Sequence, residues 1–383
     1  MGSFSYIQYP AASDLECGSL HFHEQQALII SKGGLDMEHE VTDLQLLLND
    51  AGTVREPGWA RYPVWTYNRD NIKAPWFRRK EWDYYLFNTD RFAVAFTISD
   101  LGYIGLVSVS FIDLVNAKEH TESEMIMLPR GKKFGLGASI KEADAACHTN
   151  RLDLTFERTV EGRRIKCEFR NFDKKAGTDF KADLNIKEPD MEAVYIATPW
   201  KEKPTAFYYN CKMNCLTAEG TVEYGELKFE VKHEFCSGVL DWGRGVWTYD
   251  NTWFWGTGSG RLDGEPFGLN LGYGFSDRSS ASENGIYYKG RIHKLEEVTF
   301  GIPTDSDGKR EFLKEWTVDS SDGRLKATFT PILDRSALID FKMIVSDQHQ
   351  VFGRLNGTCV TDDGERLEFR DFICALEVVR NKY

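Results

Sequence analysis

Apolar and polar side chains alternate with a period of two along most of this chain, and this alternation restricts the fold more than any other feature. Within residues 151–172, Leu152, Leu154 and Phe156 alternate with polar residues ahead of a Glu-Gly turn. The same pattern, in two cases with an Asp-Gly turn, recurs in residues 81–114, 220–235, 260–275 and 357–379. Such alternation is typical of half-buried strands, and Asp-Gly turns join antiparallel neighbours. The sequence therefore predicts an all-β fold of antiparallel barrels or sandwiches with little helix.

Two overlapping segments nearer the N-terminus do not follow this alternation. Residues 40–52 would place Leu44, Leu47 and Leu48 on one face of a helix, but they would equally suit an extended arm ending in an Asp-Ala-Gly turn. Both alternatives stay open. Residues 48–85 are polar and aromatic and contain three prolines. We expect this stretch to be a long loop wrapped over the sheet.

The chain is too long for one ordinary core. Its 383 residues suit two domains of the usual size. No low-complexity linker or strict repeat marks a boundary, so we place it near residue 245, where strand-rich segments lie on both sides. The expected division is an N-terminal β domain at 1–245, which includes the loop at 48–85, and a C-terminal β domain at 246–383.

The charge of the chain excludes several kinds of partner. A formal net charge of −12 would repel phosphate backbones and anionic lipid surfaces, so we expect no nucleic-acid partner. The first residues lack the basic start and apolar run of a signal peptide, and no apolar window reaches the length of a membrane span. We expect a cytoplasmic protein that binds a small-molecule ligand or substrate. The oligomeric state is not predicted.

Neither a metal nor a cofactor is expected. The eight cysteines are scattered, which favours reduced thiols over a disulfide framework. Cys211 and Cys215 are close in sequence but lack a second pair of ligands, and His21 and His23 share a strand face without a third ligand. None of the glycine-rich loops that bind nucleotides is present.

The segment DWGRGVWTYDNTWFWGTGSG, residues 241–260, concentrates four tryptophans and two aspartates with one arginine. Asp241 and Arg244 are flanked by indoles, and charges in such surroundings persist only when they are paired or hydrogen-bonded. One interpretation is an Asp241–Arg244 ion pair that joins two barrels. The other is a site in which the carboxylate acts as a general acid or base and the guanidinium holds a carbonyl or anionic group.

Aromatic residues after this pair would form either a core or the wall of a site. In a strand, Trp253 and Trp255 share one face and Phe254 lies on the other. Facing a cavity, these indoles would offer π surface to a ring, a polyene, a sugar or a developing cation. The other candidate lining residues are Trp242, Trp247, Tyr249, Glu283, Asn284, His293, Trp82 and Asp83. The simpler reading of the Glu-Asn-Gly stretch at 283–285 is a polar turn, and of His293 a structural hydrogen bond.

Several stretches of this sequence resemble a known bacterial family of unknown function. They are residues 58–85, 198–215, 238–260, 268–295 and 350–357, so the resemblance covers nearly the whole chain. The family is domain of unknown function family 2804, which is distantly similar to carotenoid 1,2-hydratases and AttH-like proteins. The resemblance implies two lipocalin-like β-barrels in tandem with a ligand cavity near their junction. It also implies an apolar or conjugated ligand, and in several relatives addition of water to an alkene or cyclisation of a polyene.

The resemblance extends to particular positions. Asp241 matches the aspartate of an Asp-His-x-Trp segment, and Trp253 and Trp255 match a later Trp-x-Trp strand. A turn at Asp263-Gly264 follows in both. Trp242 stands where the relatives have histidine, which removes the base that would accompany the aspartate.

We therefore expect a protein that holds a small apolar, conjugated or glycosidic molecule and acts on it as a cofactor-free lyase of the hydro-lyase type or as an isomerase. Asp241 would move a proton, Arg244 would hold a carbonyl or carboxylate, and the tryptophans would line the cavity. One alternative is a carrier or sensor without chemistry, in which the Asp241–Arg244 pair is structural. Another is a sugar-binding module or glycosidase, in which Asp241 acts with Asp250 or Glu283.

Overall fold

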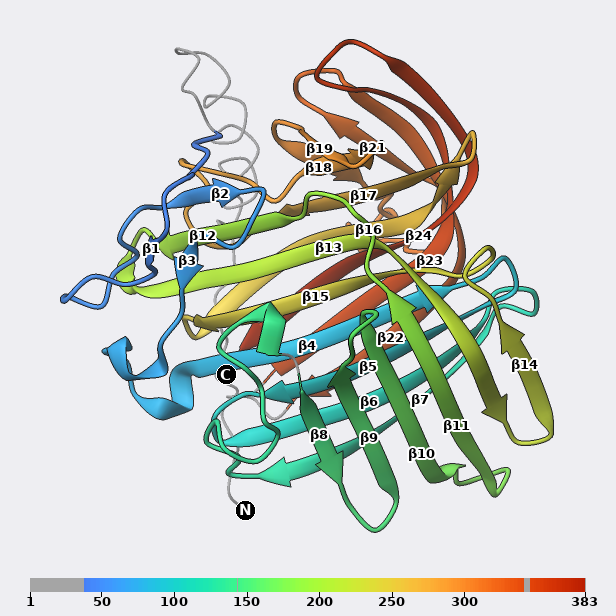
Figure 1. Ribbon diagram of the computed structural model, residues 1–383. Helices are drawn as coiled ribbons and strands as arrows, with labels where there is room; N and C mark the ends of the chain where they lie inside the picture. The colour runs from blue at the N-terminus through green and yellow to red at the C-terminus, as the bar shows by residue number, and fades with distance from the viewer. Residues whose placement is uncertain (1–37, 143, 341–344, 383) are drawn as a thin grey trace, which may run out of the picture. The chain divides into compact units, whose positions relative to one another are not determined.

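The structure is a computed structural model that describes residues 38–142, 144–340 and 345–382 (Figure 1). The described residues belong to one compact unit. His21 and His23, considered above as metal ligands, lie outside the described residues.

The first half of the described chain forms one large antiparallel sheet. Ten of its thirteen strands follow the order β7-β6-β5-β4-β15-β13-β11-β10-β9-β8, while β12 and β14 pair with β13 and β2 pairs with β12. The strands are β2 (Gly58–Ala60), β4 (Arg79–Asn88), β5 (Phe92–Asp100), β6 (Ile104–Asp113), β7 (Lys118–Met127), β8 (Ala145–His148), β9 (Leu152–Arg158), β10 (Arg163–Asp173), β11 (Thr178–Lys187), β12 (Val194–Trp200), β13 (Lys203–Tyr224), β14 (Leu227–Val231) and β15 (Ser237–Val246).

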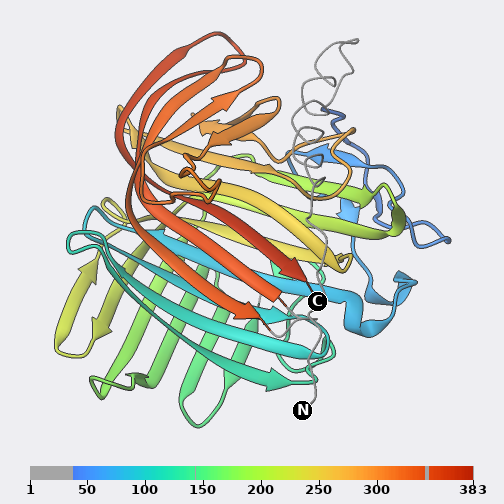
Figure 2. The same cartoon turned by 180° about the vertical axis from the view of Figure 1, so that it is seen from behind.

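The second half forms a nine-stranded antiparallel sheet in the order β19-β18-β17-β16-β24-β23-β22-β21-β20. Its strands are β16 (Asp250–Leu262), β17 (Glu265–Tyr273), β18 (Gly285–Tyr288), β19 (Arg291–Lys294), β20 (Val298–Gly301), β21 (Trp316–Ser320), β22 (Leu325–Asp340), β23 (Val345–Val360) and β24 (Arg366–Lys382). Both sheets curl (Figures 1 and 2). The prediction of an all-β fold with two curled antiparallel sheets in tandem is confirmed.

Regular structure outside these sheets is short. A parallel pair joins β1 (Gln45–Leu46) and β3 (Trp65–Thr66), and three 3-10 turns are η1 (Arg69–Asn71), η2 (Trp76–Arg78) and η3 (Ile140–Glu142). None of the helical turns in the described ranges has the length and apolar character needed to cross a membrane.

The helix considered for residues 40–52 does not form. The segment is extended through β1 and turns at Gly52, so the extended-arm alternative holds. The predicted loop at 48–85 extends too far along the chain. Its last residues, from Arg79 onward, belong to β4, which is a central strand of the first sheet. The strand expected within residues 81–114 is present in β4, but its burial does not alternate, because both of its faces are covered and charged and aromatic residues are buried on each side.

Three apolar cores stack across the molecule. One fills the curl of the first sheet, a second fills the curl of the second sheet, and a third lies between the two sheets. The third core contains Tyr84, Leu86, Ala93, Ala95, Ile112, Leu114 and Val239 from the first sheet and Trp255, Leu333, Phe352 and Ala375 from the second. In Figure 2 the red and orange strands of the second sheet lie in front of the cyan strands of the first.

The chain passes from one sheet to the other over a short link. The first sheet ends at Val246 and the second begins at Asp250. We propose this link as the boundary between two domains, close to the expected position at 245. The layer between the sheets is where the candidate site lies.

Candidate functional site

The predicted Asp241–Arg244 ion pair does not form, because the two side chains point to opposite faces of β15. Residues three apart in a strand have opposite orientations. Asp241 faces the second sheet together with Gly243 and Gly245, whereas Trp242 and Arg244 face the interior of the first sheet. The pair prediction is therefore wrong.

Asp241 pairs instead with a lysine on the neighbouring strand. Lys212 of β13 lies directly opposite Asp241 in register, and its Nζ is 2.8 Å from Asp241 Oδ2. The other carboxylate oxygen, Oδ1, accepts hydrogen bonds from Asn210 Nδ2 at 2.7 Å and from Trp82 Nε1 at 3.1 Å. The carboxylate thus has an ammonium partner and two neutral donors.

The same lysine links Asp241 to a second carboxylate. Lys212 Nζ lies 3.8 Å from Glu283 Oε2, which also accepts a hydrogen bond from Tyr208 Oη at 2.9 Å. Glu283 lies on the loop after β17, over Gly272, where a Cβ atom would be 2.0 Å from Glu283 Oε1. Burial raises the pKa of Glu283, and the charge of Lys212 opposes this shift. We call Asp241, Lys212, Glu283, Tyr208, Asn210 and Trp82 the junction site.

A third carboxylate lies beside the junction site on β24. Glu377 Oε1 accepts from Trp253 Nε1 at 2.8 Å, and its Oε2 accepts from Gln350 Nε2 at 2.9 Å. Gln350 in turn accepts from Tyr84 Oη at 3.3 Å. Burial raises the pKa of Glu377 and raises that of Tyr84 to about 12. Carboxyl groups from both sheets therefore meet in this layer.

Aromatic rings cover one end of the junction site. The ring of Trp247 lies between 5.2 and 6.0 Å, centroid to centroid, from those of Trp82, Trp200, Tyr208, Trp253 and Phe275. Trp82 packs over Gly243, where a Cβ atom would be 2.1 Å from its ring. The predicted placement of Trp253 and Trp255 on the face opposite Phe254 is what the structure has.

Asp241 is the most accessible charge of the site. Its side chain is 12% exposed, whereas those of Lys212 and Glu283 are each 3% exposed. Trp82 and Trp253, whose indoles lie at this end, are partly exposed. A ligand approaching from solvent would therefore meet Asp241 and these indoles first.

Arg244 belongs to a separate cluster inside the first sheet. Its Nη1 lies 3.0 Å from Asp83 Oδ1, and both side chains are fully buried. The guanidinium also donates to the carbonyl oxygens of Gly137, Trp82 and Gly243 and lies 4.1 Å from the Trp242 ring. Burial raises the pKa of Asp83. The structure thus places Arg244, Asp83 and Trp242 together, but on the opposite side of the sheet from Asp241.

Two more predicted residues lie at the protein surface. Tyr249 is 40% exposed and lies under the guanidinium of Arg78. Asp250 forms ion pairs with Arg380 and Lys382. Asp250 therefore does not face Asp241, as the glycosidase alternative required.

Asn284 and His293 are buried but have structural partners. Asn284 accepts from the Gly272 amide and donates to the Glu296 carbonyl. His293 Nδ1 accepts from the Asp362 amide at 3.1 Å. The structure brings neither side chain into contact with Asp241 through a hydrogen bond or ion pair among the described residues.

The sequence interpretation missed the residues that β13 contributes. Tyr208, Asn210 and Lys212 occupy alternate positions of this strand and share one face, in a stretch that is buried throughout. The signal was a row of polar-tipped side chains at period two in an otherwise apolar strand, since such a row is buried only where it meets polar partners.

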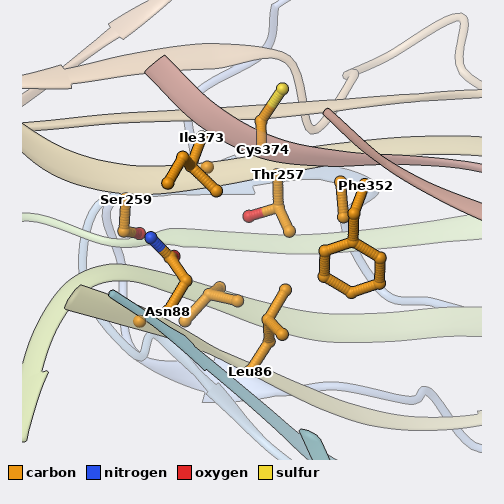
Figure 3. A pocket seen from close by; sticks show the side chains of 11 residues that line it. Leu86, Asn88, Thr257, Ser259, Phe352, Ile373 and Cys374 are labelled. Carbon is orange, nitrogen blue, oxygen red and sulfur yellow. The ribbon is translucent and has the colours of Figure 1, made fainter. Parts of the chain in front are cut away.

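A small pocket lies further along the same layer (Figure 3). Its volume of about 10 Å³ is room for roughly one water molecule. Leu86, Thr257, Ser259, Phe352 and Cys374 are among its lining residues, and none of the predicted site residues lines it. The pocket shows that the layer between the sheets is incompletely filled beyond the junction site.

Replacing Glu283 by glutamine should change how stability depends on pH. Because burial raises the pKa of Glu283 above its ordinary value of 4.5, the stability that its protonated form contributes is present below about pH 4.5 and is lost as the pH rises through the folded-state pKa. Glutamine does not ionise. Urea unfolding should therefore show Glu283→Gln gaining stability relative to wild type as the pH rises above about 4.5.

The control is Glu223→Gln, at an exposed carboxylate whose pKa is lowered by its hydrogen bond to Lys228. Its pH trend should have the opposite sign, because a lowered pKa gives stability that is lost as the pH falls. If the stability change of Glu283→Gln varied with pH in the same direction as that of the control, the raised pKa of Glu283 would be contradicted.

The chain belongs to the family described as a domain of unknown function, DUF2804, whose model matches residues 38–383. The resemblance noted in the sequence is therefore confirmed. No curated protein matches the chain.

Solved structures with similar folds include kievitone hydratase from Nectria haematococca, with 8% identity over 79% of this chain and 88% of the hydratase and a TM-score of 0.47. A putative AttH from Nitrosomonas europaea has 13% identity over 83% of this chain and 97% of its own, with a TM-score of 0.43. CghA with Sch210972 has 10% identity over 88% of this chain and 97% of its own, with a TM-score of 0.41. These similarities are too low to transfer an activity.

Proposed function

We propose that the junction site is the acid–base centre of a cofactor-free lyase of the hydro-lyase type, or of an isomerase, acting on a small molecule with a ring or conjugated system. The observation that supports this most directly is the pairing of two carboxylates in unlike surroundings around one lysine. Asp241 is ion-paired and reaches solvent, whereas Glu283 is fully buried with a raised pKa. Such pairs divide acid and base roles between two carboxyl groups.

In this proposal Asp241 is the base and Glu283 the acid. For addition of water to an alkene, Asp241 would take a proton from the water while the water oxygen bonds to one alkene carbon. Glu283 would give its proton to the other alkene carbon. The Lys212 ammonium stabilises the negative charge of the two buried carboxylates. The role first expected for Arg244, a clamp beside Asp241, is dropped because Arg244 lies on the other face of β15.

The glycosidase alternative has less support. It needs a sugar between two carboxyl groups, and one of the two partners considered for Asp241, Asp250, is held at the surface by Arg380 and Lys382. The carrier alternative stays open, because a buried charge network also suits a site that binds without reacting.

Native mass spectrometry of three purified proteins tests the proposal: wild type, Asp241→Asn and Asp250→Asn. The last removes an exposed carboxylate that faces Arg380 and Lys382. We expect Asp241→Asn to retain a small molecule that is absent or chemically altered in the other two, since the base is missing only there. The retained mass would also identify the substrate.

The contrary result is also clear. The same molecule in equal amount on all three proteins would contradict catalysis by Asp241 and favour the carrier.

A further inference from the structure

Two buried polar atoms at the aromatic end of the junction site have no hydrogen-bond partner in the described part of the chain. They are Trp247 Nε1, a donor, and Asn210 Oδ1, an acceptor. Nearly all buried polar groups in folded proteins are paired, and leaving one unpaired is costly. Groups of this kind at a site with a solvent-facing end point to a partner outside the described residues, and we take a bound ligand as that partner.

The orientation of the Asn210 amide follows from its neighbour. Its Nδ2 lies 2.7 Å from Asp241 Oδ1, and an ionised carboxylate only accepts hydrogen bonds. The nitrogen must therefore face Asp241, and Oδ1 is the atom left over.

The two unpaired atoms lie on the same side of the first sheet. Trp247 Nε1 lies over Gly245, 3.4 Å from where a Cβ atom would be. Gly245 pairs with Tyr208 across the ladder, and Asn210 is two residues further along on the same face of β13. The backbone positions of such diagonal neighbours are about 7 to 8 Å apart. One ligand lying along this face of the sheet can therefore approach both unpaired atoms.

A hydrocarbon ring already occupies the face of Trp247. Phe275, on the loop between β17 and β18, stacks on the Trp247 indole at 5.6 Å and 17°, and its edge meets Tyr208 at 4.8 Å. Its side chain is only partly buried. The neighbouring Gly274 and Ser276 have φ angles of +100° and +53°, the second being costly for a residue with a side chain. A phenyl ring offers Trp247 Nε1 no acceptor in its own plane.

We infer that the ligand of the junction site is a ring compound bearing a hydroxyl or carbonyl oxygen, rather than a hydrocarbon polyene. Its ring takes the place of Phe275 against Trp247, an oxygen accepts from Trp247 Nε1, and a hydroxyl donates to Asn210 Oδ1. The inference rests on the proposed function only for the location of the site, since binding requires no reaction.

Equilibrium dialysis with two probes of equal size tests this inference: naphthalene-2,6-diol, and 2,6-dimethylnaphthalene, which lacks both oxygens. Wild type should bind the diol at least about tenfold more tightly, since hydrogen bonds to otherwise unpaired buried groups are worth that much or more. Trp247→Phe keeps a ring but removes the N–H, and should lower this ratio at least about threefold.

Trp200→Phe is the matched control. Trp200 packs on Trp247 at 5.2 Å, but its Nε1 is already bonded to Asn251, so the wild-type ratio should persist. Equal affinities in wild type, no binding of either probe, or a full ratio in Trp247→Phe would overturn the inference. The comparison of the two probes on the wild-type protein tests the inference even if a variant fails to fold. Loss of turnover in Asp241→Asn with equal probe affinities would retain the proposed function and reject only the ligand class.

Discussion

Replacement of Arg244 by alanine should lower the free energy of unfolding by about 3 to 5 kcal/mol, the usual cost of leaving one partner of a buried ion pair alone. Arg244 is fully buried, and its guanidinium pairs with Asp83, which is equally buried. Without it, the Asp83 carboxylate has lost its closest counter-charge, and the carbonyl oxygens of Gly137, Trp82 and Gly243 each lose a donor. The loss should appear in urea unfolding followed by circular dichroism at neutral pH.

The control for this variant is Arg370→Ala. Arg370 pairs with Glu368 at the surface, with side chains 80% and 60% exposed, and water screens the charges of such exposed pairs, so they contribute little to stability. If Arg244→Ala changed stability by no more than Arg370→Ala, the cluster inside the first sheet would not be a structural one.

Replacement of Lys212 by methionine should have a similarly large effect on stability, because two carboxylates lose the ammonium they share. Asp241 and Glu283 contact Lys212 Nζ from the two sheets, so the expected loss is again about 3 to 5 kcal/mol at neutral pH. Lys212 lowers the otherwise raised pKa of Glu283. Without it, Glu283 should take up a proton more readily, and the deficit should shrink as the pH falls.

Neutralising the carboxylates tests the cause of that loss. Adding Asp241→Asn and Glu283→Gln to Lys212→Met should recover much of the stability, since a neutral set leaves no uncompensated charge. Lys228→Met, at an exposed pair with Glu223, is the control and should have little effect. A Lys212→Met protein as stable as this control would show that the lysine is not needed to neutralise the layer between the sheets.

The all-β fold could be predicted because residues such as Leu152, Leu154 and Phe156 alternate visibly, each strand having one buried and one exposed face. β4 could not be predicted in the same way. It is central to the first sheet and covered on both faces, so Glu81, Asp83 and Tyr85 are as buried as Tyr84. Where both faces are buried, polarity no longer marks the face, and the β4 residues were assigned both to the alternating segment 81–114 and to the loop at 48–85.

The candidate site was predicted in part for a related reason. The segment at 241–260 pointed to Asp241 and to Trp253 and Trp255, which do lie in the layer between the sheets. Proximity in sequence suggested that Asp241 and Arg244 pair, but an odd spacing along a strand separates them. Their true partners are on other strands, Lys212 for Asp241 and Asp83 for Arg244. Only the register of neighbouring strands identifies such partners.

The opposed charges on the two faces of β15 also govern how the first sheet can assemble. A one-residue slip of β15 against β4 or β13 would turn every side chain to the other face. Asp241 would then leave Lys212, and Arg244 would leave Asp83, so both sides of the strand would hold buried charges without partners at once. Each such error costs several kcal/mol. The polar residues at the centre of this strand therefore fix its register during folding, because the pairings shifted by one residue in either direction are strongly destabilised.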